Sequence, residues 1–370
     1  MRARRHVSML LAAAGLVAAA PAIAHAGAWS TVPSPNPSGG QDVLNDIGRL
    51  PGTRVLYAVG RTSTGTLVLR SADAGRTWHV EPAPSPGSGA QLTAVSVRRR
   101  GVWAVGYRAG PRHTTTLVMR RKGGTWRIVR SPSPAPLDFL YDVVTTGAGT
   151  WAAGAATGTG GSSQPLILRW NGSSWKAQRT PSLPKGDNLL FGVAAHGAKV
   201  WALGERSKGS GKLHPLALHR TRSGWRVSAA PDPARGGESF FLDGTFSGKA
   251  LWAVGGRGSG SAHALAERHT PSGWKAFTVP DGCPVTNTLA AVEPIPGTKQ
   301  LWAVGDCSPG LGNRTFVSKR RNGVWKHVAS PTPDTSGSFL TGVVAFSKAR
   351  AAAVGYRTPA GFRTIALIYR

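Results

Sequence analysis

The chain has 370 residues, of which 45 are Lys or Arg and 16 are Asp or Glu, giving a formal net charge of +29 at pH 7. Such a basic surface favours acidic partners in a salt-dependent way, or it serves only to keep the protein soluble. Lys and Arg are spread along the sequence, so charge alone names no partner and predicts no specific nucleic acid. After residue 26 no apolar run reaches the roughly 18 to 20 residues of a membrane helix, which excludes a later transmembrane segment.

Residues 1–26 have the layout of a secretory signal peptide. Basic residues at the start, Arg2, Arg4 and Arg5, precede an apolar stretch over 7–23 and a small-residue exit, Ala24-His25-Ala26. We expect cleavage after Ala26 and a secreted mature chain of residues 27–370. The mature protein could be released from the cell or stay associated with the cell envelope. An N-terminal membrane anchor is the alternative, and Pro21 together with the small-residue exit disfavours it.

Two sequence markers repeat about every fifty residues. The first is an apolar or aromatic residue followed by Ala, a small apolar residue and Gly, and it occurs at 57–60, 103–106, 151–154, 201–204, 252–255, 302–305 and 352–355. The second is a Trp just after a turn, at Trp29, Trp78, Trp126, Trp175, Trp225, Trp274 and Trp325. A repeat of this length indicates stacked supersecondary units, so it overrides the two domains that length alone suggests.

A third marker is a short alternating run that precedes each Ala-x-Gly segment. It is led by Leu44, Leu92, Leu140, Leu190, Leu242, Leu289 and Leu340. Each unit therefore contains four short β-rich runs separated by Gly, Pro, Ser and Asn, with no helical pattern. The sequence predicts an all-β fold, a seven-bladed β-propeller with four-stranded antiparallel blades, spanning residues 27–370 as a single domain.

The two ends of the chain predict how the ring closes. The sequence ends after three strands of the last unit, and the first segment of the mature chain, 29–33, is an orphan fourth strand. Pairing the two would complete the last blade and leave no raw sheet edge. We expect loss of residues 29–33 to be strongly destabilising.

The first marker has a packing interpretation. In Trp-Ala-Val-Gly on a strand, Trp and Val point to one face, whereas Ala and Gly point to the other. The large face would fill the space to one neighbouring blade, and the small face would let the other neighbour approach closely. The tryptophans are therefore expected to be core residues and not ligand platforms.

The turn before Trp78 carries a recognisable motif. The segment 71–78 contains Ser71, Asp73, Gly75 and Trp78 in a Ser-x-Asp-x-Gly-x-x-Trp pattern. It resembles the Asp-box of bacterial-neuraminidase-type (BNR) repeats, and the other units carry worn versions of it. The motif makes sense as a stapled hairpin turn, with Asp accepting backbone N–H bonds and Gly allowing positive φ. The overall pattern also resembles secreted propeller-repeat proteins of actinobacteria.

The resemblance implies a fold and not a sialidase activity. In the family these boxes are structural and lie on the ring face away from the active site. A sialidase-like site would also need an arginine cluster, a Tyr nucleophile paired with Glu, and an acidic proton donor. The sequence shows no Arg-Ile-Pro segment ahead of the Asp-box and no convincing Tyr–acid pair, so no catalytic residue is assigned and the chain is not expected to be an enzyme.

The two cysteines predict a disulfide. Cys283 precedes the inner strand of one unit, and Cys307 follows the next strand, so antiparallel neighbours bring both to one rim of the same blade. Closing this loop would stabilise the fold by about 3 kcal/mol in the chain-entropy model.

The ten His residues are scattered without metal-ligand spacing, and no Gly-rich segment opens a helix, so no metal and no cofactor are predicted.

Arginines recur just after the marker Gly. They are Arg61, Arg108, Arg206, Arg257 and Arg357, and the loops that follow them should lie on one face of the ring. There they could grip a carboxylate, sulfate or phosphate, with Asp138, Tyr141, Asp187 and Glu238 sharing the same funnel. The alternative is a set of solvated loop charges with occasional salt bridges, such as Arg206 with Glu205 or Glu238.

The leading hypothesis from sequence is a non-catalytic extracellular propeller, expected to be a monomer. Its partner would be an anionic glycan, a cell-envelope polymer or another extracellular protein, bound through the loop face. Two other classes stay open: a glycan-active hydrolase or lyase, and a purely structural envelope protein.

Overall fold

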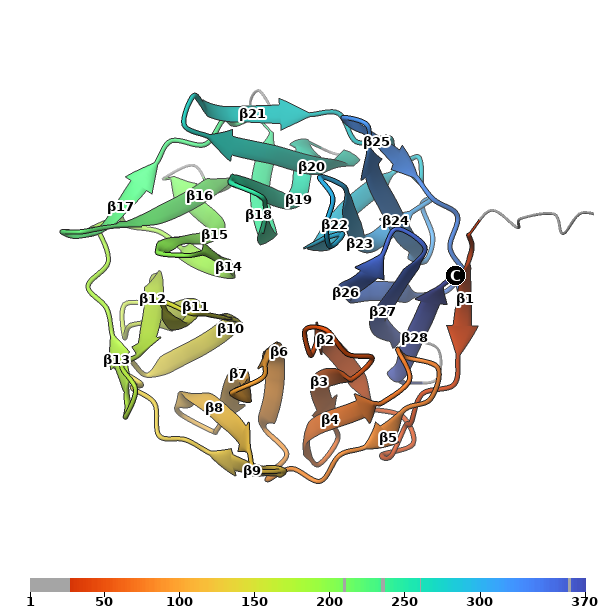
Figure 1. Cartoon of the computed structure of the whole chain (residues 1–370). Coiled ribbons are helices and arrows are strands. Elements are labelled where there is room, and N and C mark those ends of the chain that lie inside the picture. Colours follow the sequence, from red (N-terminus) through yellow and green to blue (C-terminus); the bar gives the residue numbers. More distant parts are fainter. Residues whose placement is uncertain (1–26, 209–210, 234–236, 260, 359–360) are drawn as a thin grey trace, which may run out of the picture.

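The computed structural model describes residues 27–208, 211–233, 237–259, 261–358 and 361–370. The proposed signal peptide, residues 1–26, lies outside this range. Every regular element in the described part is a β-strand. The all-β prediction is therefore confirmed, and Figure 1 shows the strands arranged in sheets around a central axis.

Among the described residues the strands form three sheets of four and two of eight. One four-stranded sheet contains β2 (Val43–Arg49), β3 (Leu56–Thr62), β4 (Gly65–Ser71) and β5 (His79–Val80). A second contains β14 (Asn188–His196), β15 (Lys199–Lys208), β16 (Lys212–Thr221) and β17 (Gly224–Ser228). The third contains β26 (Ser338–Ser347), β27 (Arg350–Arg357) and β28 (Arg363–Tyr369) with β1 (Trp29–Val32). In this last sheet β1 pairs antiparallel with β28, with Trp29 opposite Tyr369.

Each eight-stranded sheet contains two antiparallel groups of four. One has β6 (Ala90–Arg98), β7 (Gly101–Ala109), β8 (Thr114–Lys122) and β9 (Thr125–Ile128) with β10 (Leu137–Thr146), β11 (Gly149–Thr157), β12 (Ser163–Trp170) and β13 (Trp175–Ala177). The other has β18 (Glu238–Ser247), β19 (Ala250–Ser259), β20 (Ser261–Thr270) and β21 (Gly273–Phe277) with β22 (Thr286–Pro294), β23 (Leu301–Ser308), β24 (Arg314–Arg321) and β25 (Val324–His327). A single parallel residue pair joins the two groups in each case, Leu137 with Thr114 and Ala262 with Thr286.

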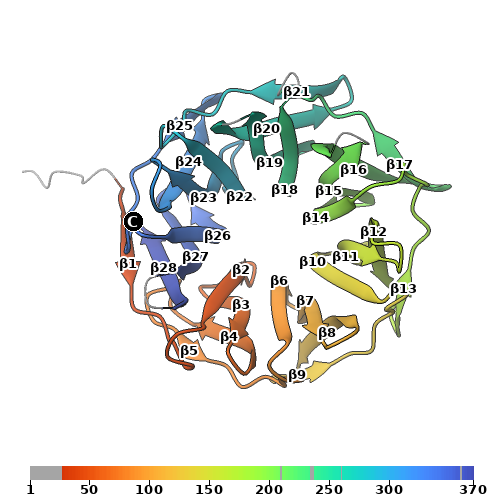
Figure 2. The same ribbon diagram turned by 180° about the vertical axis from the view of Figure 1, so that it is seen from behind.

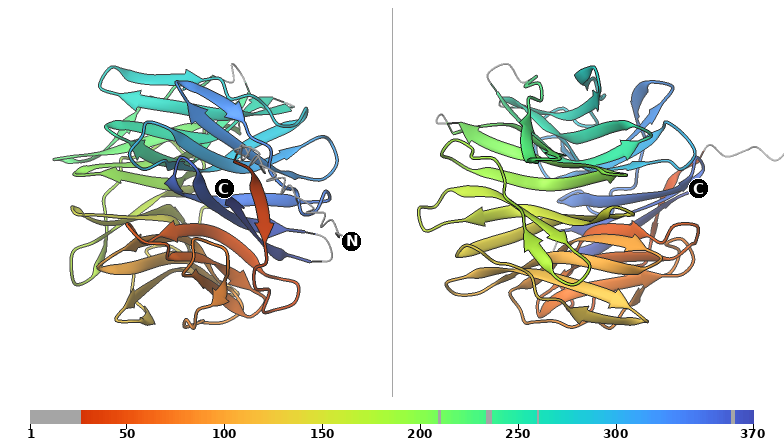
Figure 3. Two further views of the ribbon diagram at one scale, coloured as in Figure 1. Left: turned by 45° about the vertical axis from the view of Figure 1, so that its right-hand side comes forward. Right: turned by 60° about the vertical axis from the view of Figure 1, so that its left-hand side comes forward.

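The first strand of each group lies nearest the axis. These strands are β2, β6, β10, β14, β18, β22 and β26, as both face-on views show (Figures 1 and 2). The side views show loops emerging on two opposite faces (Figure 3). We call the face with the loops that enter these inner strands the loop face, and the opposite face, with the β2–β3 and β4–β5 turns, the turn face.

The marker tryptophans pack between neighbouring groups, as the sequence predicts. Trp103 and Val105 belong to a core cluster with Val143 and Trp175 of the next group, whereas Ala104 faces Val59 of the preceding group. Ring pairs join one group's first marker to the next group's turn Trp: Trp103–Trp175 at 5.2 Å, Trp151–Trp225 at 5.8 Å, Trp201–Trp274 at 5.7 Å, Trp252–Trp325 at 5.9 Å and Trp302–Trp29 at 5.3 Å between centroids. All five pairs are edge-on, the arrangement that aromatic quadrupoles favour.

Two details of the repeat differ from the sequence interpretation. The marker Gly does not serve the approach of a neighbouring blade, because a Cβ on Gly60 would lie 1.8 Å from the carbonyl oxygen of Val43 in the adjacent strand of the same sheet. In the β18 unit the position of the leading Leu is taken by Phe241, which pairs with Gly255, and not by Leu242. Both differences arise from a β-bulge in each inner strand, where the pairing register shifts by one residue.

Candidate functional site

The bulge of each inner strand places one equivalent residue on the wall of the central channel. These residues are Asp46, Ala94, Asp142, Gly192, Asp243, Ala291 and Gly342, each the first residue after the register shift. Acidic and small residues thus mostly alternate around the axis. At Gly192 there is no room for a side chain, because a Cβ there would lie 2.9 Å from the Cα of Asp243 on the neighbouring inner strand.

The three aspartates connect neighbouring inner strands. The Oδ2 atom of Asp142 accepts the backbone N–H of Val193 on the next inner strand at 2.7 Å, and its Oδ1 accepts the N–H of Val143 at 2.6 Å. Asp46 and Asp243 make the same two bonds to the equivalent residues. Each carboxylate therefore satisfies backbone donors that the bulge removes from the sheet ladder.

The pKa values of these aspartates lie above their ordinary range. Burial is the main cause in all three, and it raises the pKa of Asp142 to about 6. The pKa values of Asp46 and Asp243 are raised further because the charge of Asp142 adds to the effect of burial, while the backbone hydrogen bonds act in the opposite direction. The channel wall thus gathers three carboxyl groups whose ionisation burial makes less favourable.

A cavity of about 400 Å³ opens at the loop-face end of the channel. We call this opening the loop-face mouth. Its lining includes the three aspartates, the amides of Asn45 and Gln91, the hydroxyls of Thr93 and Thr341, and the rings of Tyr141 and Phe191. No Lys, Arg or His belongs to this lining. The mouth is therefore acidic, amide-rich and aromatic.

An aromatic tract runs along one side of the loop-face mouth. Tyr107 contacts Phe139 with centroids 4.8 Å apart, Phe139 stacks on Tyr141 at 6.0 Å, and Tyr141 contacts Phe191 at 5.3 Å. All four rings are half-buried, so each keeps an accessible surface. Rings that stay accessible beside a concave opening are typical of binding sites.

Acidic residues flank one end of this tract. Burial raises the pKa of Glu205 to about 7, and the nearby charges of Glu238 and Asp187 raise it further in the same direction. Burial also raises the pKa of Tyr141 to about 12, with Tyr107 and Glu205 adding smaller contributions. Of the predicted residues, Tyr141 lines the mouth. Asp187 and Glu238 are exposed and do not line it, and Oδ1 of Asp187 accepts the backbone N–H of Ser163 at 3.0 Å.

Among the predicted arginines, Arg61 contacts an aromatic ring of the loop face. Its guanidinium lies over the ring of Phe362, 5.2 Å from the centroid. Burial raises the pKa of Tyr107 and of Tyr356, and the charge of Arg61 partly opposes both shifts. Arg61 directly follows its marker Gly, whereas each of the other four arginines stands two residues after its marker Gly. Because side chains alternate along a strand, Arg61 points to the opposite side of its sheet from the other four.

The structure does not gather the other four arginines. Arg108 is exposed and lines a separate cavity of about 330 Å³, and Arg357 lines another of about 480 Å³. Arg357 lies 3.9 Å from Asp334. Arg206 and Arg257 stand opposite His214 and His263, and these histidines bond to Asp232 and Asp281. Within the described part of the chain Arg206 makes no ion pair with Glu205 or Glu238.

Asp138 occupies a structural position. Its side chain is fully buried, and its Oδ2 accepts the backbone N–H of Ala135 at 2.9 Å, which holds the loop that enters β10. Asn188 and Asn287 bind their own entering loops from the equivalent position. The expectation that Asp138 shares the funnel is therefore corrected, because its carboxylate points into the loop and away from solvent.

Several residues of the mouth were not singled out from the sequence. They are Tyr107, Phe139, Phe191 and the three channel aspartates. The available signal was the pair of residues that flank the leading Leu of each unit, as in Phe139-Leu140-Tyr141 and Leu190-Phe191. A bulge next to that Leu turns its neighbours toward the channel, and the bulge has no sequence signature in these units.

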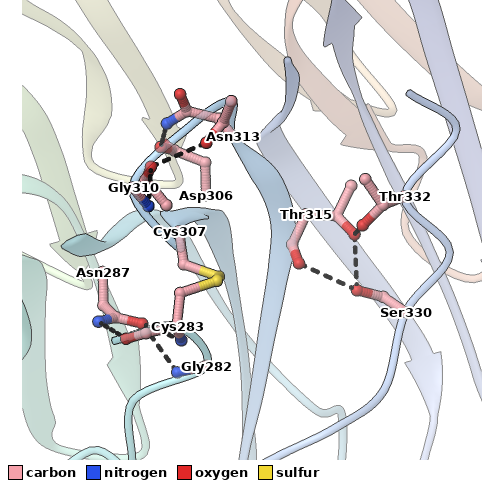
Figure 4. Close-up of a disulfide and its surroundings, with 12 residues drawn as sticks. Gly282, Cys283, Asn287, Asp306, Cys307, Gly310, Asn313, Thr315, Ser330 and Thr332 are labelled. Carbon is pink, nitrogen blue, oxygen red and sulfur yellow. Dashed lines mark hydrogen bonds between the residues drawn. A yellow bond between two sulfur atoms is a disulfide. The ribbon is translucent and has the colours of Figure 1, made fainter. Parts of the chain in front are cut away.

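The disulfide prediction is confirmed. Cys283 and Cys307 are bonded, with Cα atoms 5.5 Å apart, at the loop-face rim of the β22–β25 group (Figure 4). Asn287 lies beside the bond and accepts the backbone N–H groups of Gly282 and Cys283 at 2.8 and 2.9 Å. The disulfide and this side chain together fix the loop that enters β22.

The turn from Ser71 to Trp78 forms the predicted staple. Oδ1 of Asp73 accepts the backbone N–H groups of Arg76 and Thr77, both at 3.0 Å, and Ser71 accepts that of Gly75 at 2.9 Å. Burial acts to raise the pKa of Asp73, but the hydrogen bonds from Thr77 and its neighbours lower it overall. The backbone N–H of Ala74 donates to the carbonyl of Arg54, so this turn lies on the turn face.

Among the residues that the structure describes, no group of three or more His, Cys, Asp or Glu side chains is placed to hold a metal ion. No helix in the same ranges is long and apolar enough to cross a membrane.

Comparisons with known proteins show the fold and not the family. No protein-family model matches the chain, and no curated protein matches it. The solved structures that it resembles are β-propellers. They include "YCF48 bound to D1 peptide" (TM-score 0.55, 13% identity, covering 93% of this chain and 94% of that one) and "Structure of YjhT" (0.53, 11%, 81% and 99%). A third is "Structure of U3-55K" (0.59, 9%, 92% and 98%). At these identities the likeness establishes a β-propeller.

Proposed function

We propose that this chain is a secreted, non-catalytic binding protein that takes a glycan at the loop-face mouth. The observation that carries the proposal is the aromatic tract from Tyr107 to Phe191 beside a cavity of about 400 Å³. Aromatic faces with a few oriented polar groups are the usual lining of a small-ligand site. Sugar rings present C–H faces to aromatic rings and hydroxyls to carboxylates and amides, and the mouth offers both.

The acidic lining narrows the type of glycan. Neutral or amine-bearing sugar units suit a cavity whose ionisable groups are the carboxyls of Asp46, Asp142 and Asp243. An acidic substituent would instead be placed at the edge of the site toward Arg61, whose charge acts on Tyr107. The proposed ligand is therefore a cell-envelope or extracellular glycan whose sugar rings, more than its negative charges, determine binding.

Two features support an extracellular location. Residues 1–26 have a signal-peptide layout, and the Cys283–Cys307 disulfide suits an oxidising compartment. The bond lies on the same face as the proposed site, where it would hold an entering loop in place outside the cell.

A hydrolase is the second candidate, and one observation favours it. Tyr141 and Glu205 lie close enough for the charge of Glu205 to raise the pKa of Tyr141. A Tyr with a neighbouring carboxylate is the nucleophile arrangement of sialidases. Burial makes the Tyr141 hydroxyl harder to ionise, which disfavours an activated nucleophile. Turnover of a glycoside by the wild type, abolished in both Tyr141→Phe and Glu205→Gln, would establish the hydrolase.

We also infer that the propeller has seven blades. Each eight-stranded sheet divides at its single parallel residue pair into two groups of four strands, and seven groups of four result. The pairing of β1 with β28 supports closure of the ring by the first strand of the mature chain.

The proposed resemblance to Asp-box repeat proteins rests on the hydrogen-bonded turn from Ser71 to Trp78.

Binding of purified residues 27–370 to an array of extracellular and envelope glycans tests the proposed function. We expect a saturable signal that survives near-physiological salt and falls at least tenfold in Tyr141→Ala. Val80→Ala is the matched control, because Val80 is an exposed apolar residue on β5 and does not line the mouth. No saturable glycan signal, or equal loss in the control, would refute the proposal.

A further inference from the structure

The turn-face end of the channel holds a second cavity, of about 530 Å³. We call this opening the turn-face mouth. Its charged and titratable lining consists of Arg49 on β2, Arg98 on β6, His196 on β14 and Glu293 on β22. This lining differs from that of the loop-face mouth, where three carboxylates occur and no basic residue does. The channel therefore has two mouths of opposite charge.

Both guanidinium groups of the turn-face mouth keep free donors. Arg49 lies over the ring of Phe346, with 5.2 Å to the centroid. Arg98 donates through Nη1 to the carbonyl of Val97 at 2.9 Å, and its other N–H groups make no hydrogen bond to described residues. Among the residues that the structure describes, neither arginine has a carboxylate within ion-pair distance. Each can still donate to a ligand through several N–H groups.

Glu293 faces the same cavity without a partner of its own. In the described ranges its carboxyl makes no hydrogen bond and no ion pair. Burial raises its pKa to about 7, although the charges of Arg49 and Arg98 act to lower it. All three side chains line the same cavity of about 530 Å³, and no ion pair joins Glu293 to Arg49 or Arg98 among the described residues. A small anion can therefore enter between them.

We propose that the turn-face mouth binds a phosphate group between Arg49, Arg98 and Glu293. Arg49 and Arg98 extend from neighbouring inner strands, and Glu293 from a strand on another part of the ring. A carboxylate has two oxygens, which a single arginine can engage in bidentate fashion. A tetrahedral oxyanion has further oxygens directed elsewhere, so it can bond to both arginines and to Glu293 at once.

Glu293 gives the site a means to distinguish phosphate from sulfate. Phosphate keeps a proton at neutral and mildly alkaline pH, so its O–H can donate to the Glu293 carboxylate. Sulfate has no such proton, and its oxygens would face the carboxylate without a hydrogen bond, which is unfavourable. The cavity should therefore select the free phosphate ion, because a phosphate monoester at mildly alkaline pH has lost this proton and resembles sulfate.

Calorimetric titration of residues 27–370 with inorganic phosphate, sulfate and methyl phosphate at pH 8 tests the proposal. We expect phosphate to bind at least tenfold more tightly than sulfate, and Arg49→Ala and Arg98→Ala each to weaken phosphate binding about tenfold or more. Arg100→Ala is the matched control, since Arg100 is exposed on the adjacent turn and lies outside the cavity lining. Methyl phosphate is a dianion without an O–H at pH 8, so we expect it to bind as weakly as sulfate, and methyl phosphate binding as tightly as phosphate would contradict the role of the proton.

A second variant tests the role of Glu293. Glu293→Gln should keep phosphate binding to the two arginines but bind sulfate nearly as well as phosphate. Phe191→Ala, at the loop-face mouth, should leave phosphate binding unchanged, which separates the two sites. Equal binding of phosphate and sulfate by the wild type would overturn the proposal. So would an equal effect of Arg49→Ala and Arg100→Ala in variants whose thermal unfolding matches that of the wild type.

Discussion

Glu267 is an acidic side chain in a core position of the repeat. The residues that stand opposite the marker Ala in the other units are Leu69, Met119, Leu168, Leu218, Ser318 and Leu367. Glu267 is fully buried, and neither carboxylate oxygen has a hydrogen-bond partner among the described residues. Burial, with a contribution from Asp232, raises its pKa to about 8. The protein therefore holds Glu267 protonated at neutral pH.

Replacing Glu267 by Leu should stabilise the fold, and more so at high pH. The pKa of Glu267 is higher in the folded chain than in the unfolded one, so the wild type binds more protons when folded and loses stability as pH rises from about 4.5 to about 8. The full loss from this group is about 3 to 5 kcal/mol. Urea unfolding of Glu267→Leu and wild type at pH 5 and pH 9 measures the difference.

Glu267→Gln is the control for this prediction. Gln has no charge at either pH, so this variant should lose most of the pH dependence but keep a buried polar group without a partner. A Glu267→Leu variant that is less stable than the wild type at pH 9 would show that the carboxyl has a partner in solution.

Asp142 connects two inner strands by a single carboxylate. Removing it in Asp142→Ala leaves the N–H groups of Val143 and Val193 without their acceptor, and we expect a loss of about 1 to 3 kcal/mol in unfolding free energy. The exposed residue Glu238 is the control, because Glu238→Ala should change stability by no more than about 0.5 kcal/mol. Equal unfolding midpoints in urea for Asp142→Ala and Glu238→Ala would contradict the connecting role.

At the scale of elements, Trp29 anchors β1 in addition to the backbone pairing of this strand with β28. Trp29 is 5% exposed and contacts the rings of Trp302 and Tyr369 at 5.3 and 5.6 Å. Trp29→Ala should cost about 3 to 5 kcal/mol, because it empties a core site at the seam between the first and last strands. Thr31 is exposed on the same strand, so Thr31→Ala tests the backbone pairing alone and should have little effect on the thermal midpoint. Similar midpoints for the two variants would refute the prediction.

The disulfide fixes the loop that enters β22. Cys283→Ser with Cys307→Ser should lower unfolding free energy by about 3 kcal/mol, since the bond closes a loop with a sequence separation of 24. Thermal unfolding with and without a reductant measures this. The reductant should lower the midpoint of the wild type to that of the double variant and leave the variant unchanged. A wild-type midpoint that the reductant does not alter would contradict a stabilising bond.

The strands could be predicted from sequence because three markers recur at one period. Alternation along the strand predicts that Trp103 is a core residue, and antiparallel pairing predicts that the two cysteines meet. The bulges have no sequence signature in these units, so the sequence reveals neither the position of Phe241 nor the aspartates of the channel. The prediction for Asp138 fails for another reason, because its carboxyl accepts the N–H of Ala135 in the loop that enters β10.

At the scale of the whole molecule, the surface and the channel have different charge. The formal net charge is +29, yet the loop-face mouth is lined by three carboxylates and no basic side chain. A ligand that binds only to the basic surface should be released by salt, since exposed charges separated by more than about 10 Å are screened at 0.1 M. A ligand held by the aromatic tract should stay bound. Salt therefore separates non-specific attraction from binding at the mouth.

The most direct measurement compares glycan binding by two variants at near-physiological salt. One is Phe191→Ala, which removes a ring of the mouth, and the other combines Arg108→Ala, Arg206→Ala and Arg257→Ala, which removes charge from the rim. We predict that Phe191→Ala loses at least tenfold in affinity and that the arginine variant keeps saturable binding. Loss of binding in the arginine variant with Phe191→Ala unaffected would contradict a site at the loop-face mouth and place the ligand on the basic rim.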